Sequence, residues 1–487
     1  MDVLNKTIKK LTDAEYNELV MQVSGKKKNK PYLILEASRS RDVSDDEMME
    51  MLQVNPGAYY TLKSRLNNKI ASVLSEKVQS PVNILLNEVA KIPAHLHGTN
   101  REFSIRALID LEKQLIEYDL STELILVYKT LAQLNLYDND NYEYYDNLYK
   151  KHVAFSLAAG KAENILFRFI RKMGIYLLTL EQEVLEDLVL LKRELSNVCE
   201  MYDSHRLFVI YSIVNIYYQC NVLSKRDSLK SQELEIEDTL QKMTATFENY
   251  SQDTFYQSIR FVVDFLYFEY YQKTNNQVRA DFYLDRINPQ IPDMCTKHAM
   301  NFYLSQFLNT KVEKYLNDRN LESMTALNET LTSTLDVGLQ EEYHYISARK
   351  FVAISKFYQN DFSGAAKSMN ELRMNISLKK YLHCDIECKL FQALQYCIMG
   401  EDGLCHQIIS SVKRQVSENE QQWESASLFI RLLKTALKPL DYRKKIKRVN
   451  DMWAEFTEKN NAASHPVLRF VKLDETLMRK MANPIKE

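Results

Sequence analysis

Glycine and proline are scarce throughout this sequence, and their scarcity restricts the fold more than any other feature. Nine Gly and nine Pro are spread over 487 residues, whereas average usage is about 7 % Gly and 5 % Pro. Both residues interrupt helices, because glycine loses the most backbone entropy on folding and proline lacks an amide donor. We therefore expect long helices with few sharp turns, and the sequence predicts an all-α protein.

Net charge and cysteine usage bear on the cellular compartment and on the kinds of partner that the protein can bind. The formal net charge is −2, so affinity for nucleic acid would need a local basic patch. Seven scattered cysteines do not form the pattern of a disulfide framework, and the N-terminal stretch MDVLNKTIKKLTDAEY lacks the apolar core of a signal peptide. The most apolar windows are interrupted by charged residues and are too short to span a membrane. These features predict a cytoplasmic protein that does not enter the membrane.

The clearest local signal for two joined helices lies between Ser44 and Ile70. Ser44 and Glu47 have the spacing of a capping box, which predicts a helix that begins at Ser44 and ends near Gln53. An Asn-Pro-Gly turn signal follows, and its Pro56 is well placed to open a second helix. The apolar positions of that second helix fall on one stripe, which consists of Tyr59, Leu62, Leu66, Ile70 and Val73.

This helical hairpin resembles the helix-turn-helix unit of DNA-binding proteins. In such a unit a short first helix supports a second helix that enters the major groove. The resemblance implies a nucleic-acid surface on the second helix and phosphate contacts from a lysine-rich loop ahead of it. The implied residues are Lys26, Lys27, Lys28, Lys30, Tyr59, Tyr60, Lys63, Arg65 and Lys69. The alternative is an ordinary helical hairpin beside a solvated loop.

The remaining sequence predicts a series of helical hairpins. Residues 1–79 are expected to form a small helical domain, 80–100 a connector, and 101–487 a right-handed superhelix of helices about 15 to 20 residues long. Within the series, FVAISKFYQNDFSGAAKSMNEL (351–372) resembles a tetratricopeptide repeat, because Asp361, Phe362 and Ala365 match its turn and its small residue. No regular repeat length extends over the whole chain. The resemblance therefore implies a degenerate, tetratricopeptide-like α-solenoid, whose last helical segment is predicted at 466–481.

A broader resemblance rests on three short segments. PYLILEASR, AYYTLKSRLN and LAQL, together with the helical body, look like uncharacterised cytoplasmic proteins of Bacteroidetes-type bacteria. This resemblance implies the helical architecture and assigns no chemistry.

Few residues form a pattern that would support catalysis or metal binding. The sequence has no glycine-rich phosphate loop, no nucleophile elbow and no histidine pair at metalloprotease spacing. Cys384 and Cys388 are one helical turn apart and could hold zinc together with His383, Cys397, Cys405 or His406, although buried cysteine is also a common small core residue. We expect core packing, no cofactor and no enzymatic activity.

Two functions follow from these observations. The first is a DNA-associated regulator whose superhelix receives a protein or peptide partner. The second is a cytoplasmic protein-protein interaction scaffold that does not bind nucleic acid. They differ in the surroundings of Lys63, Arg65 and Lys69, which should be exposed together in the regulator and paired with acidic residues such as Glu88 or Asp110 in the scaffold.

Overall fold

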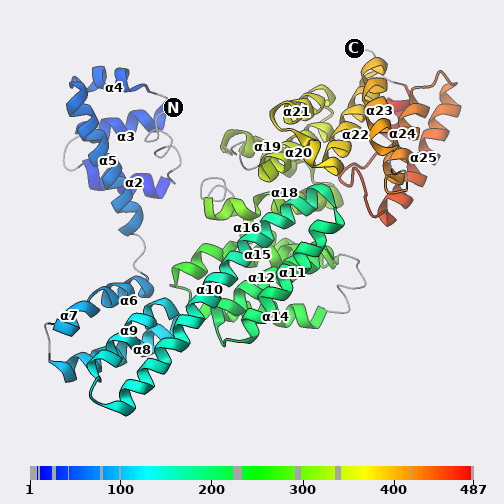
Figure 1. Ribbon diagram of the computed structural model, residues 1–487. Coiled ribbons are helices and arrows are strands. Elements are labelled where there is room, and N and C mark those ends of the chain that lie inside the picture. The colour runs from blue at the N-terminus through cyan, green and yellow to red at the C-terminus, as the bar shows by residue number, and fades with distance from the viewer. Residues whose placement is uncertain are drawn as a thin grey trace. The chain divides into compact units, whose positions relative to one another are not determined.

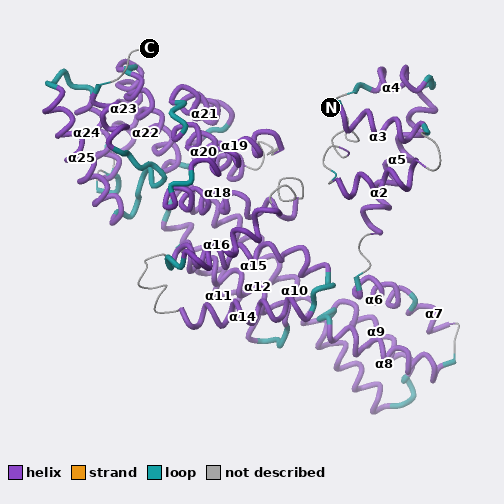
Figure 2. Tube along the Cα trace, turned by 180° about the vertical axis from the view of Figure 1, so that it is seen from behind, coloured by secondary structure: helices purple, strands orange, loops and turns teal. Residues whose placement is uncertain are grey.

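Every regular element in the described part of the chain is a helix, as the low Gly and Pro content predicts (Figures 1 and 2). The structure is a computed structural model. It describes residues 8, 11, 13–24, 29–41, 43–76, 80–97, 100–222, 233–290, 298–334, 342–417, 419 and 421–483. No helix among these residues is both long enough and apolar enough to cross a membrane. By its internal contacts the chain divides into two units, which are residues 1–156 with 247–259 (unit 1) and 157–246 with 260–487 (unit 2).

The first helices of unit 1 pack around a core of their own. All residues of this core come from the predicted N-terminal domain, and they include Leu19, Ile34, Leu35, Leu66 and Ile70. Helix α2 contacts α3 and α5, and α3 also contacts α4. The helices are α2 (Asp13–Ser24), α3 (Lys30–Ser40), α4 (Asp45–Leu52) and α5 (Pro56–Glu76).

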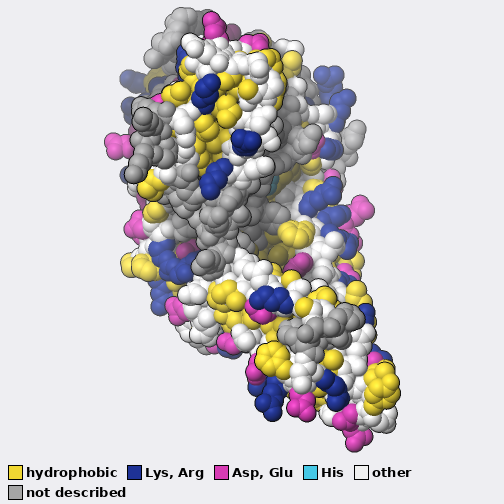
Figure 3. All heavy atoms as spheres, turned by 90° about the vertical axis from the view of Figure 1, so that its left-hand side faces the viewer, with side chains coloured by type: hydrophobic (Ala, Val, Ile, Leu, Met, Phe, Trp, Pro, Cys, Tyr) yellow, Lys and Arg dark blue, Asp and Glu magenta, His cyan; other side chains and the backbone are white. Residues whose placement is uncertain are grey.

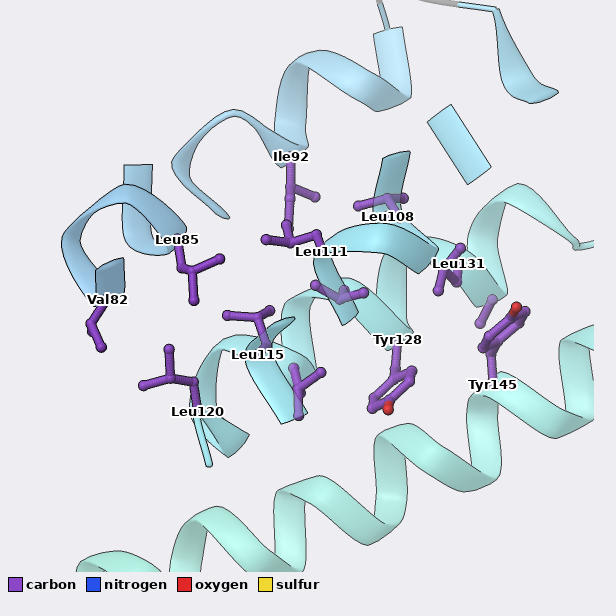
Figure 4. Packing of buried hydrophobic residues seen from close by; sticks show 13 residues of the cluster. Val82, Leu85, Ile92, Leu108, Leu111, Leu115, Leu120, Tyr128, Leu131 and Tyr145 are labelled. Atoms are coloured by element: carbon purple, nitrogen blue, oxygen red, sulfur yellow. The ribbon is translucent and has the colours of Figure 1, made fainter. Parts of the chain in front are cut away.

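Within the range 80–100, which is predicted as a connector with a short helix around 82–89, residues 81–90 and 92–97 are helical and contribute to a second core. Val82, Leu85 and Ile92 are buried there and point toward side chains of the following two helices (Figure 4). Three buried apolar side chains give this segment a packed core, which a linker would lack. The helices of this second group are α6 (Pro81–Ala90), α7 (Ile92–His97), α8 (Arg101–Glu117) and α9 (Ser121–Leu134).

Helix α10 (Asn139–Thr179) is 41 residues long and exceeds the predicted 15 to 20 residues. It contains Gly160 and Gly174, and neither glycine ends it. A Cβ on Gly174 would lie 3.0 Å from the ring of Tyr343, so this glycine permits close packing of α10 on the helix that carries Tyr343. The weak helix preference of glycine, about 1 kcal/mol, is too small to break a helix that is packed along its length.

Unit 2 continues as helices joined mostly by short turns. Among its described elements, α11 contacts α12, α18 contacts α20, and α20 to α23 contact one another in chain order. The bounds are α11 (Gln182–Glu200), α12 (His205–Asn221), α14 (Glu233–Asn249), α15 (Thr254–Lys273), α16 (Gln277–Ile287), α18 (His298–Asp318), α19 (Leu321–Thr334), α20 (Glu342–Tyr358), α21 (Phe362–Asn375), α22 (Leu382–Met399), α23 (Asp402–Val416), α24 (Glu424–Ala436), α25 (Tyr442–Ala462) and α26 (Glu475–Ala482). Helix α14 and helix α15 each extend into unit 1.

The segment that resembles a tetratricopeptide repeat forms the helical hairpin of α20 and α21. Asp361 caps α21 by accepting a hydrogen bond from the Gly364 amide at 2.8 Å. Ala353 and Ala365 are fully buried, and their small size lets the two helices approach closely. The predicted hairpin is therefore confirmed at this position.

The prediction of a helical segment over 466–481 is wrong in its first half. Residues 463–474 are irregular, and α26 begins at Glu475 after the cap Asp474. Asn460 holds this irregular segment by hydrogen bonds of 2.9 Å to both the amide and the carbonyl of Val467. Two backbone groups of the segment are thus bonded to a side chain of the preceding helix, α25, and not to a helical ladder of their own.

Candidate functional site

The hairpin of α4 and α5 forms as its sequence signals predict. Ser44 and Glu47 make the reciprocal hydrogen bonds of a capping box, and α4 ends at Leu52. Gln53 then adopts a left-handed conformation with φ 50°, which reverses the chain before Pro56 opens α5. Residues other than glycine can adopt this left-handed backbone conformation at a modest steric cost.

Asp45 joins the two helices of this hairpin. Its carboxylate accepts hydrogen bonds of 2.8 Å from the Tyr59 hydroxyl and from Lys63 Nζ, and Tyr60 lies within 3.5 Å. The Lys63 ammonium also lies over the rings of Tyr59 and Tyr60. Burial raises the pKa of Asp45, but the hydrogen bonds from Lys63 and Tyr59 outweigh it, so the net pKa is lowered. The arrangement holds α5 against α4 and uses side chains that were predicted to face nucleic acid.

The predicted nucleic-acid residues therefore lie in different surroundings. Tyr59 is 2 % exposed and faces the core, as its place on the apolar stripe requires. The Lys63 side chain is 12 % exposed and is paired with Asp45. Lys69 is half-buried, and the exposed members are Lys30, Tyr60 and Arg65. Lys26, Lys27 and Lys28 lie outside the described residues.

Acidic residues begin α4, the helix that would lie beside the DNA backbone if α5 entered the major groove. Asp45, Asp46 and Glu47 occupy the first turn of α4, and no basic residue follows in its last turn. Phosphates would be repelled by such a helix. The Lys and Arg side chains seen in Figure 3 are scattered among uncharged ones and do not merge into one basic surface in that view. Glu88 and Asp110, named above as possible acidic partners, instead pair with Lys91 and Lys113, each three residues further along the chain.

A polar groove lies across three consecutive helices of unit 2, with about 680 Å³ of empty space that includes its open side. Its floor is α22, and its walls are α21 and α23. Arg373 donates to the Gln392 side chain at 2.9 Å, and Gln392 donates to the Tyr396 hydroxyl at 3.2 Å. The lining residues are Asn370, Arg373, Lys389, Gln392, Tyr396, Leu404, Gln407, Ile408 and Ser411.

The cysteines considered as metal ligands are buried in helix packing. The Cys384 and Cys388 sulfurs are 3.9 Å apart, and both residues are 1 % exposed. The hydrogen bond with Cys384 and burial raise the pKa of the Cys388 thiol, which favours its protonated form. Within the residues that the structure describes, no three His, Cys, Asp or Glu side chains are grouped so that they could hold a metal ion.

A buried ion pair lies beside these cysteines. Lys350 of α20 donates to Glu387 of α22, and Glu387 also accepts from the Leu468 amide at 3.0 Å. Although burial raises the pKa of a carboxyl, the Lys350 ammonium lowers the pKa of Glu387 to about 2. Burial lowers the pKa of the adjacent His383 to about 4, so its imidazole is neutral at pH 7.

A second buried acid, Glu269 of α15, lies in a network of side-chain amides. Its Oε1 accepts from Gln306 at 2.6 Å and from Asn221 at 3.1 Å. Burial raises the pKa of Glu269 to about 7, although the charge of Lys273 and the two amide donors act against this rise. Burial therefore favours the protonated carboxyl at pH values where an exposed glutamate is ionised.

Sequence reasoning missed both buried acids. Lys350 and Glu387 are separated by 37 residues, as are Glu269 and Gln306. The one available signal was a charged residue inside a helix that is apolar nearly all round, as Glu269 is in α15, because such a residue must be paired or functional when it is buried.

Similarity to known proteins adds nothing to this geometry. Comparison of the chain with models of protein families, with curated proteins and with solved structures found no match in any of the three. The resemblances to helix-turn-helix units, to tetratricopeptide repeats and to proteins of Bacteroidetes-type bacteria therefore stay predictions.

Proposed function

We propose that the chain is a non-enzymatic binding protein and that its tetratricopeptide-like hairpins form a superhelical surface for an acidic peptide segment of a protein partner. The groove of α21, α22 and α23 carries this proposal. Its lining combines two cations, Arg373 and Lys389, with amide side chains and the Tyr396 ring. Such a surface can pair with carboxylates and bond the backbone of an extended peptide.

The cations of the groove are only partly neutralised by the protein. Asp385 lies 2.6 Å from Lys389 and 3.8 Å from Arg373, so one carboxylate serves both cations. Arg373 has a planar guanidinium with several donors, and Gln392 occupies one of them. A carboxylate from a peptide would accept hydrogen bonds from the remaining donors of the Arg373 guanidinium.

A selection from a displayed library of random peptides tests the proposal. Peptides that bind the full chain should be enriched in Asp and Glu, and Arg373→Gln should weaken them about tenfold, which is the loss of one charge-assisted contact of about 1.4 kcal/mol. Arg414→Gln is the matched control, because Arg414 is exposed on α23 outside the groove. Enrichment of basic or charge-free peptides, or equal weakening by both variants, would refute the assignment.

A DNA-associated regulator remains the second candidate, and one feature of α5 favours it. Five exposed polar or aromatic residues follow one another at helical spacing along this helix, as a base-reading face would require. They are Tyr60, Thr61, Ser64, Arg65 and Asn68.

Binding to mixed-sequence duplex DNA at low and moderate salt tests this second candidate. If α5 contacts phosphates, binding should weaken steeply with salt, and the double variant Arg65→Ala, Lys69→Ala should lower the salt slope by about one per lost contact. Lys63 is left unchanged because it holds the hairpin together, and Lys91→Ala serves as the control. Absence of binding at low salt removes the regulator hypothesis.

A further inference from the structure

The hairpin of α20 and α21 and the hairpin of α22 and α23 are two copies of one structural unit. Asn360 and Gly400, which are 40 residues apart, follow the first helix of each hairpin in a left-handed conformation, with φ 63° and 75°. The next amide, that of Asp361 or Glu401, donates to the carbonyl five residues earlier at 3.0 or 2.9 Å. Fully buried small residues recur at the same interval, namely Ala353 with Ala393 and Ala365 with Cys405. A surface feature of one hairpin is therefore expected at the equivalent place on the other.

A second groove lies one structural unit before the proposed peptide site. Its floor is α20, its walls are α19 and α21, and it contains about 760 Å³ of empty space, its open side included. It is named the α20 groove after its floor, and the groove of α21, α22 and α23 is likewise the α22 groove. The floor positions that correspond at the 40-residue interval are Arg349 with Lys389, Val352 with Gln392, and Lys356 with Tyr396. The same face of the repeated unit thus forms both grooves.

The α20 groove also carries two cations. The Arg349 guanidinium lies over the Tyr345 ring, 5.3 Å from its centroid, and 3.7 Å from the Glu371 carboxylate. Both side chains of this ion pair are more than a third exposed, so water screens the pair and it holds Arg349 weakly. Lys356 is half-buried, and no carboxylate of the described residues lies within ion-pair distance of its ammonium. A carboxylate from a partner can therefore pair with either cation.

The separation of the two grooves suits one extended segment. Helix α20 packs against α21, and α21 packs against α22. Packed helices lie about 8 to 10 Å apart, so the two floors are at most about 20 Å apart. An extended chain advances about 3.3 Å per residue, and about six residues therefore connect the grooves. The helix between them carries one cation and one acid, Lys367 and Glu371, so neutral residues of the segment would cross it without net attraction or repulsion.

We propose that the α20 groove is a second subsite for the acidic peptide segment, so that one extended segment with two acidic clusters about six residues apart occupies both grooves. This inference rests on the proposed function of the α22 groove. A segment with a single acidic cluster would meet the cations of one groove only. Two linked clusters should bind more tightly, because the second contact forms within the complex that the first contact has already made.

Fluorescence anisotropy with two synthetic peptides of equal composition tests this proposal. Each peptide carries four glutamates among glycines and serines. The split peptide has two glutamates on either side of about six neutral residues, and the compact peptide has all four in a row. At physiological salt, which screens charges beyond about 8 Å, the full chain should bind the split peptide about tenfold more tightly than the compact one.

Three variants of the full chain locate the second cluster. Lys356→Gln should abolish the preference for the split peptide, and Lys356→Arg, which keeps the charge, should retain it. Lys379→Gln is the matched control, because Lys379 is exposed in the turn before α22 and lines neither groove. Since Lys356 has no ion-pair partner among the described residues, its replacement leaves no acid of the protein unpaired.

The outcomes separate this inference from the function on which it rests. Equal or tighter binding of the compact peptide, an unchanged preference in Lys356→Gln, or an equal loss of preference in Lys379→Gln would overturn the second subsite. The α22 groove would remain the peptide site in these cases if Arg373→Gln still weakens binding. Absence of binding by both peptides would refute the proposed function, and the second subsite with it.

Discussion

Single side chains determine how the α4 and α5 hairpin is held together. Asp45 accepts hydrogen bonds from one tyrosine and one lysine of α5, and together they fix the angle between the two helices. The same contacts bury the Tyr59 side chain and most of the Lys63 side chain. A lysine that reads as a phosphate contact in the sequence is thus a structural residue in the fold.

Substitution Asp45→Asn should destabilise the hairpin by about 1 to 2 kcal/mol at pH 7, because the amide cannot pair with the Lys63 ammonium. The folded pKa of Asp45 is lowered, so its contribution is complete above the unfolded value of 3.8 and is lost as the pH falls through the folded pKa. Native-state hydrogen exchange of α5 measures the change. Asp46→Asn, at the neighbouring exposed position, should change exchange little, and a difference that persists below the folded pKa would contradict the assignment.

Glu269 should make unit 2 less stable as the pH rises. Its folded pKa of about 7 exceeds the unfolded value of 4.5, so the folded state holds the proton more tightly between these two values. Stability should therefore fall across this window, by about 3 kcal/mol at most, at about 1.4 kcal/mol per pKa unit.

The variant Glu269→Gln should remove this dependence, because glutamine resembles the protonated carboxyl. Urea unfolding at several pH values, followed by the fluorescence of Trp423 and Trp453, measures it. The wild type and Glu235→Gln, a change at an exposed acid of α14, should show the same slope with pH. An unchanged slope in Glu269→Gln would show that another group is responsible.

At the scale of the element, the two glycines of α10 allow a matched comparison. Gly160→Ala should stabilise the protein by about 0.5 to 1 kcal/mol, because nothing lies within 4 Å of the added Cβ. Gly174→Ala should show no such gain, since its Cβ would press on the Tyr343 ring at 3.0 Å. Urea unfolding of both variants measures the difference. An equal gain in the two would mean that Tyr343 moves aside without cost.

One hydroxyl, that of Tyr358, bonds two backbone groups of the irregular segment 463–474. Tyr358→Phe removes the bonds to Phe470 and Lys472 and should cost about 1 to 2 kcal/mol, with faster proteolysis within this segment. Limited proteolysis of the full chain measures the effect. Tyr442→Phe, at an exposed tyrosine of α25, should leave the cleavage rate unchanged. Equal rates in wild type and Tyr358→Phe would contradict this role.

Local signals predicted helices well and long-range contacts poorly. The Ser44 cap, the Pro56 helix start and the Asp361 cap act within a few residues, so the sequence alone locates them. The sequence predicts a helical segment over 466–481, but the chain is irregular up to Asp474. The irregular part is held instead by Asn460 and by Tyr358, which is more than a hundred residues away. No local pattern contains such a contact.

The groove of α21 to α23 and the buried network around Glu269 also differ in how well the sequence predicts them. The groove follows from the predicted hairpins, since three consecutive packed helices create it. The network around Glu269 instead joins side chains of α12, α15 and α18. Only the unusual placement of Glu269 in an apolar helix pointed toward it.

For the whole molecule, near-neutral charge and successive helical hairpins favour recognition of a protein segment over binding driven by a general electrostatic field. A net charge of −2 gives little long-range attraction for a polyanion. The proposed peptide surface instead depends on a few cations within one groove. Recognition of this kind should be local and should leave the α4 and α5 hairpin unaffected.

Hydrogen exchange of the full chain with a selected acidic peptide, and separately with duplex DNA, tests the peptide-binding function most directly. We expect the peptide to slow exchange within 362–416, the range of α21 to α23, and DNA to leave exchange in 56–70 unchanged. Slower exchange in 56–70 with DNA, together with no change in 362–416 with the peptide, would contradict the proposed function.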